Sequence, residues 1–202
     1  MNIDLKGKIA LIGGAQGLLT TGICEALAAN GATIFDIDPA AQNASPDAPD
    51  PFLLVLVSEG ANGLPAIDRS NSAERLAFSN ALRAYAGRVK RVVLIMSAAG
   101  LVPVKGFSEF SADQASLVSM TRSLAMNLAP ATVVNAVAVG ACEGDDGIAS
   151  SRFMKHTGVK RAATLEEIIA VVLFAADPDN GYMTGHTLTV DGGWAIGYAR
   201  DF

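Results

Sequence analysis

The chain has 202 residues, of which half are hydrophobic and 17% are charged, so we expect one domain, residues 1–202, with one sizeable core. The formal net charge is -5, and the 15 lysines and arginines form no basic run, which argues against a nucleic-acid partner. No apolar run reaches membrane-spanning length, so we expect a cytoplasmic protein without a membrane partner.

The first elements in chain order read as a strand, a glycine turn and a helix. The apolar run at residues 8–12 ends in a turn that contains Gly13 and Gly17, and a helix-like stretch follows at residues 21–30. A second apolar run, residues 32–37, leads into Asp38. These segments predict one βαβ unit.

The remaining elements continue this alternation. Continuous apolar runs typical of strands covered on both faces lie at residues 52–57, 91–96, 132–139 and 187–190. Apolar residues with helical spacing lie at residues 72–85, 112–128 and 165–176. The alternation predicts an α/β fold with a doubly wound parallel sheet. Residues 39–51, rich in Ala, Pro and Asp, have no room for a helix and a strand.

Several of these segments together resemble the short-chain dehydrogenase/reductase family. The glycine loop at residues 11–18 and the helix and turn behind it, residues 25–32, are similar to that family's nucleotide-binding start. Sequence similar to that of the family then recurs, in the family's order, at residues 93–103, 117–130, 133–141 and 183–194. The resemblance implies a Rossmann-type sheet and NAD chemistry. It also implies that residues 39–51 replace the family's third helix and third strand.

The resemblance also identifies the family's catalytic positions in this chain. Active members use a serine, a tyrosine and a lysine, in which the tyrosine exchanges a proton with the substrate and the lysine lowers the tyrosine pKa. The serine position holds Ser97, the tyrosine position holds Phe110 and the lysine position holds Gln114. Phenylalanine has no proton to exchange, so we expect no intact catalytic set.

The cofactor positions implied by the resemblance are altered as well. Gly13, Gly17 and Asp38 are the candidate cofactor-binding residues, and a ligand-free turn and a solvated aspartate remain open as alternatives for them. Where the family has a third glycine, this chain has Leu18 or Leu19, which we expect to crowd a pyrophosphate. Altered family positions also lie at Ser58-Glu59-Gly60 and at Gly144. We therefore expect no cofactor in this chain, and no metal, because neither His156 nor His186 has a companion ligand.

Two functions follow from this pattern. One is a non-catalytic subunit that assembles, in a heterotetramer, with a homologous active dehydrogenase that carries NAD. The resemblance extends to heteromeric dehydrogenases of this kind, one of which acts on a hydroxyacyl-CoA. The alternative is a divergent NAD(P)-dependent oxidoreductase, or a non-redox enzyme, that uses Ser97 with another group.

Overall fold

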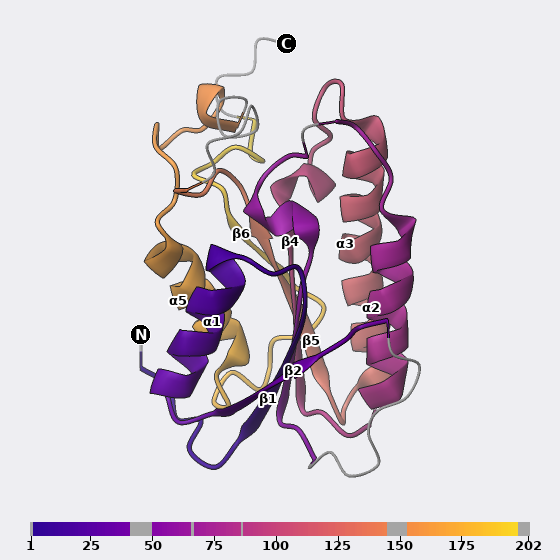
Figure 1. Cartoon of the computed structure of the whole chain (residues 1–202), viewed down its shortest axis with the longest axis vertical. Helices are drawn as coiled ribbons and strands as arrows, with labels where there is room; N and C mark the ends of the chain where they lie inside the picture. The colour runs from indigo at the N-terminus through magenta and orange to yellow at the C-terminus, as the bar shows by residue number, and fades with distance from the viewer. Residues whose placement is uncertain (1, 41–49, 66, 86, 145–152, 198–202) are drawn as a thin grey trace.

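One parallel sheet runs through the part of the chain that the computed structural model describes, which is residues 2–40, 50–65, 67–85, 87–144 and 153–197. Its order is β2-β1-β3-β4-β5-β6, and every pair of neighbours is parallel (Figure 1). The strands are β1 Ile9–Gly14, β2 Thr33–Ile37, β3 Leu53–Val57, β4 Arg91–Ser97, β5 Val133–Val139 and β6 Thr187–Val190. The chain reverses its direction of winding between β1 and β3, which is where ligands bind in open α/β sheets.

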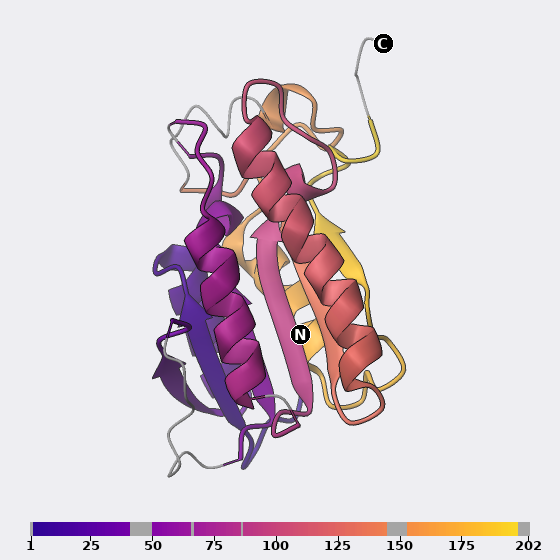
Figure 2. The ribbon, with the colours of Figure 1, turned by 90° about the vertical axis from the view of Figure 1, so that its right-hand side faces the viewer.

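Helices cover both faces of this sheet. The helices α1, Leu18–Ala29, and α5, Leu165–Ala176, lie on one face, while α2, Ser72–Tyr85, and α3, Ser108–Leu128, lie on the other (Figures 1 and 2). This arrangement confirms the predicted α/β, doubly wound, Rossmann-type parallel sheet. No helix within the described ranges is long and apolar enough to span a membrane.

The core is split by the sheet into two apolar layers. β3 and β4 are buried along their whole length, as is β5 after its first residue, which explains their continuous apolar sequences. Leu19, Ile23 and Leu27 of α1 pack on one face with residues of α5, and Phe78 and Leu82 of α2 pack on the other with residues of α3. The central strands therefore form a rigid platform for the loops at their carboxyl ends.

The sheet is shorter than a full sheet of the resembled family, as predicted. β2 is an edge strand, and no other described strand pairs with its outer side. Residues 41–49, most of the segment expected to replace a helix and a strand, lie outside the described residues.

Two helices begin earlier than their apolar spacing predicted. α1 begins at Leu18 instead of residue 21, because Leu19 already belongs to the buried stripe that it shares with Ile23. α3 begins at Ser108 instead of residue 112, which places Phe110 inside its first turn. The cause of this second difference is a distant side chain, Asp68.

Candidate functional site

The three family positions meet at the carboxyl end of the central strands. Ser97 is the last residue of β4, and Gln114 of α3 contacts both it and Ser58, which follows β3. Phe110 of α3 lies in an apolar cluster with Ala98 and Ala99, which follow Ser97. All of these side chains are buried. The predicted catalytic positions are therefore neighbours, as the resemblance implied.

Gln114 joins two strand ends through its side-chain amide. Its Oε1 accepts a hydrogen bond from the Ser97 backbone N–H at 2.9 Å, and its Nε2 donates to Ser58 Oγ at 3.0 Å. The residue is only 2% exposed. A glutamine supplies both an acceptor and donors, whereas a lysine ammonium has donors only, so a lysine here would leave the Ser97 N–H without its acceptor. At this position the side chain serves as a structural bridge.

Ser97 directs its hydroxyl into the protein. The residue is fully buried, and its Oγ accepts a hydrogen bond from the Ala99 N–H at 3.2 Å, which caps the short 3₁₀ turn Ala98–Gly100. The Ser97 Oγ therefore has a structural role as the acceptor that caps this turn.

Phe110 belongs to an apolar cluster at the same end of the sheet. Its buried neighbours in the cluster include Phe107, Phe153 and Trp194, of which the last two pack edge to face with ring centroids 4.7 Å apart. The ring also lies over Gly60, where an added Cβ would come within 2.6 Å of Phe110 Cζ. Gly60 thus leaves room for the phenyl ring, and Phe110 is part of the packing.

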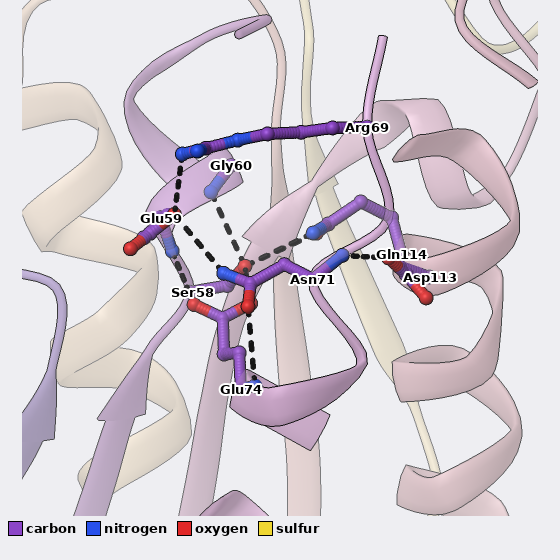
Figure 3. Close-up of polar contacts among 8 residues, drawn as sticks. All are labelled: Ser58, Glu59, Gly60, Arg69, Asn71, Glu74, Asp113 and Gln114. Carbon is purple, nitrogen blue, oxygen red and sulfur yellow. Dashed lines mark hydrogen bonds and ion pairs between the residues drawn. The ribbon is translucent and has the colours of Figure 1, made fainter. Parts of the chain in front are cut away.

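A network of carboxylates, which the sequence did not reveal, surrounds these positions (Figure 3). Glu74 accepts hydrogen bonds from Ser58 Oγ at 2.8 Å and from the Glu59 N–H at 2.6 Å. Burial raises the pKa of the Glu74 carboxyl above its ordinary value, and the nearby charges of Glu59 and Asp113 add to this rise. The network therefore concentrates negative charge beside Gln114.

The rest of this network holds the segment before α2 in place. Asn71 donates its backbone N–H to Asp113 and its side-chain Nδ2 to Glu59 at 3.0 Å, and Arg69 forms an ion pair with Glu59 at 3.6 Å (Figure 3). These contacts join residues 10 to 42 positions apart in sequence. No local pattern in the chain could have signalled them.

Asp68 holds the start of α3 from the same segment. Its carboxylate accepts hydrogen bonds from the backbone N–H groups of Phe110 at 3.0 Å and Glu109 at 3.4 Å, and from Ser108 Oγ at 3.3 Å. The hydrogen bond from Phe110, followed by those from the neighbouring groups, lowers the pKa of Asp68. A helix whose own N-cap residue, Phe107, offers no side-chain acceptor is thereby capped.

The glycine loop keeps its tight backbone turn. Gly14 has a φ of 105°, and an added Cβ would lie 2.1 Å from the Val57 carbonyl oxygen, so no other residue fits there. The Ala15 N–H donates to the same oxygen at 2.7 Å, which fixes the loop to β3. Gly13 and Gly17 flank this turn, ahead of the N-terminus of α1.

Leu18, Leu19 and Asp38, the other residues considered for the cofactor region, differ in their surroundings. Of the two leucines predicted to crowd a pyrophosphate, Leu19 does not do so, because it is fully buried in the core. Leu18 is instead the exposed leucine, and it reaches to 3.3 Å from where a Cβ would stand on Gly144, in the loop after β5. The Asp38 carboxylate accepts a local hydrogen bond from the Ala40 N–H at 2.9 Å. An exposed apolar side chain thus lies at the first residue of α1, next to the glycine turn.

Metal ligands are not gathered anywhere in the described ranges, where no group of three or more His, Cys, Asp and Glu residues could hold an ion. The carboxylates beside Gln114 are instead engaged by amide, hydroxyl and guanidinium donors.

Comparisons with known proteins establish the family. Residues 69–195 match the family model described as Enoyl-(Acyl carrier protein) reductase, and the chain belongs to the short-chain dehydrogenase/reductase family. A short-chain reductase, NovJ, of Streptomyces niveus is 37% identical over 44% of this chain and 38% of its own length. The 3-oxoacyl-[acyl-carrier-protein] reductase of a Synechocystis strain is 34% identical over 52% of this chain and 44% of its own length. The matches thus span less than half of each of these relatives.

Solved structures agree on the fold. A short-chain type dehydrogenase/reductase of Mycobacterium ulcerans superimposes with a TM-score of 0.81 at 16% identity, covering 99% of this chain and 94% of that one. A short-chain dehydrogenase of Leptospira borgpetersenii with bound NAD+ superimposes with a TM-score of 0.76 at 17% identity, covering 96% and 94%. The family typically contains NAD(P)-dependent oxidoreductases on this fold.

Proposed function

We propose that this chain is a non-catalytic member of a short-chain dehydrogenase assembly, in which a homologous subunit binds NAD and performs the oxidation. The observation that carries the proposal is the bridge made by Gln114. Active relatives have a lysine at this position, which lowers the pKa of the tyrosine. In this chain the position holds a buried glutamine, whose amide forms hydrogen bonds with Ser97 and Ser58.

Two further features support the same proposal. Phe110 has no ionisable group and packs in an apolar cluster, and the Ser97 hydroxyl caps a turn. Each of the three positions therefore contributes to the packing or the hydrogen bonding of the fold. Leu18 and the local turn of Asp38 make the dinucleotide region a poor host for NAD.

The partner is proposed to be an active homologue in a heterotetramer, joined through α2 and α3. These helices carry exposed apolar side chains, Leu76 on α2 and Met126 on α3, which are 62% and 77% exposed. Apolar residues left exposed on two adjacent helices favour association with another protein surface. The substrate of the assembly is proposed to be a hydroxyacyl-CoA, oxidised in the active subunit.

The test is reconstitution with a homologous dehydrogenase from the same genome that carries the family's tyrosine and lysine. Expressed together, the two should elute as one heterotetramer in light-scattering chromatography, and the isolated chain should neither oxidise hydroxyacyl-CoA substrates nor bind NADH. Met126→Glu should weaken the assembly, whereas Tyr182→Glu, at an exposed position outside both helices, should not. Micromolar binding of NADH by the isolated chain, or failure of the two proteins to associate, would overturn the proposal.

A further inference from the structure

A pocket of about 510 Å³ opens beside the bridge made by Gln114. It lies between the 3₁₀ turn Glu59–Asn62, the segment 63–71 and the first turns of α2 and α3. Pockets of this volume accommodate small organic molecules. Glu59, Gly60 and Gln114 line it, so it borders the positions that are altered relative to the family, whereas neither Ser97 nor the loop after β5 lines it.

The pocket combines an apolar wall with a charged wall. Leu64, Pro65 and Phe110 contribute the apolar side. The charged side has the carboxylates of Glu59, Glu74 and Asp113 and the guanidinium of Arg69 (Figure 3). An apolar wall with a few convergent polar groups is typical of a ligand site, because the apolar part supplies binding energy and the polar part sets orientation.

The sign of the charge selects the ligand. Arg69 is largely exposed and is already paired with Glu59, so its charge is not available to an incoming anion. Glu74 lies deeper, where burial first, and the charges of Glu59 and Asp113 in addition, disfavour its ionised form and raise its pKa. A cation beside these carboxylates would stabilise the ionised form, whereas an anion would disfavour it further.

The geometry also favours an organic cation over a metal ion as the ligand. The carboxylates are not arranged as a metal-binding group in the described part of the chain, and several of their oxygens accept hydrogen bonds from Ser58, Asn71 and the Glu59 N–H. A metal ion needs several carboxylate oxygens converging on one point. An ammonium group needs only acceptors at hydrogen-bonding distance, and the apolar wall requires a hydrocarbon body beside it.

We infer that this pocket binds a small organic ammonium compound, with its hydrocarbon body against Phe110, Leu64 and Pro65 and its ammonium group facing Glu74 and Asp113. The replacement of the family's tyrosine by Phe110 gives the pocket its aromatic wall, and Gly60 leaves space for that ring. This inference goes beyond the proposed subunit role and does not depend on a partner.

The experiment titrates the isolated full chain with three probes of one shape, benzylamine, benzyl alcohol and benzoate, near pH 8. Amide NMR signals report where each probe binds. Benzylamine, which is protonated at this pH, should shift the signals of Gly60, Asn71 and Asp113, with an affinity about tenfold or more above that of benzyl alcohol. Benzoate should not bind.

Variants test which carboxylates bind the ammonium group. Glu74→Gln and, independently, Asp113→Asn should each weaken benzylamine binding about tenfold. Glu109→Gln, in the same first turn of α3 but outside the pocket, should leave it unchanged. Equal binding of benzylamine and benzyl alcohol, signals that shift elsewhere, or no binding of benzylamine at millimolar concentration would each overturn the inference. Because the readout is binding to the isolated chain, it is distinct from the reconstitution test.

Discussion

The helices α3 and α5 begin in different ways. α5 is capped within its own sequence: the Thr164 hydroxyl accepts from the Glu167 N–H at 3.3 Å, and the Glu167 carboxylate accepts from the Thr164 N–H at 2.9 Å. α3 has no such local cap and depends on Asp68, which lies some forty residues earlier. The position of α3, and with it the candidate site, therefore depends on contacts between distant segments.

The same contrast continues beyond the first turn. On α5, Arg161 holds Glu167 from six residues away with two hydrogen bonds of 2.6 Å. On α3, Asp113 holds Asn71 and Gln114 holds Ser58 and Ser97, from 17 to 56 residues away. A local cap secures one helix, whereas the contacts of α3 secure the helix, two strand ends and the segment 68–71 together. Substitutions at α3 should therefore have the larger effects.

The largest effect is expected for Gln114→Leu. The substitution keeps the volume but leaves the buried Ser97 N–H without an acceptor, which should lower the free energy of unfolding by about 2–3 kcal/mol. Chemical denaturation measures it. Gln16→Leu is the matched control, because Gln16 is exposed and makes only a 3.4 Å contact with the Gly14 carbonyl. An equal, small effect at both positions would show that the bridge does not stabilise the fold.

The next largest effect is expected for Gly60→Ala, which should lower the free energy of unfolding by about 2 kcal/mol. The new methyl group would overlap the Phe110 ring and approach Gln114 Nε2. Gly181→Ala serves as the control, since nothing lies within 4 Å of its added Cβ. Part of the loss should be recovered in a Gly60→Ala, Phe110→Leu double variant. Without that recovery, contact with the ring would not be the cause.

The fold could be predicted from the sequence because its signals are local. Continuous apolar runs gave β3, β4 and β5 nearly to the residue, and the bounds of α2 and α5 follow from apolar spacing. The start of α3 could not be predicted, because the cap that moves it to Ser108 is contributed by Asp68. The apolar spacing within a helix carries no information about a capping residue forty positions away.

The candidate site was predictable in position but not in its interactions. The resemblance placed Ser97, Phe110 and Gln114 together, and the structure does so. It could not reveal that Gln114 is a bridge, that Leu19 is a core residue, or that Glu74 lies beside Ser58. Each of these depends on the direction of a side chain relative to a distant segment, which sequence spacing does not encode.

A smaller effect is expected for Thr164→Ala, which removes the hydroxyl acceptor of the local cap of α5. The loss should be about 1 kcal/mol, as is usual for an N-cap, and confined to this helix. Ser119→Ala, at an exposed position within α3, should cost less than the cap does. Hydrogen exchange should accelerate in the first turn of α5 and stay unchanged at Phe110. Faster exchange at both helices would mean that the two caps are coupled.

The effect of removing the Asp68 carboxylate, the distant cap of α3, should depend on pH. The folded pKa of Asp68 is lowered, so its ionised form stabilises the folded chain at neutral pH, and this contribution is lost as the pH falls from the ordinary carboxyl range through the folded pKa. The Tm of Asp68→Ala should therefore lie below that of the parent chain at neutral pH and approach it in acid.

Glu167 sharpens the comparison, because its side-chain hydrogen bonds from Arg161 lower its pKa to about 2. For Glu167→Gln the gap in Tm should likewise close only as the pH falls toward about 2. The two variants should also differ in how far their structural effect extends. Asp68→Ala should shift the NMR signals of the Phe110 ring, and Glu167→Gln should not. A gap in Tm that stays constant with pH would exclude the charge as the cause. An unmoved Phe110 signal in Asp68→Ala would show that α3 keeps its position without the distant cap.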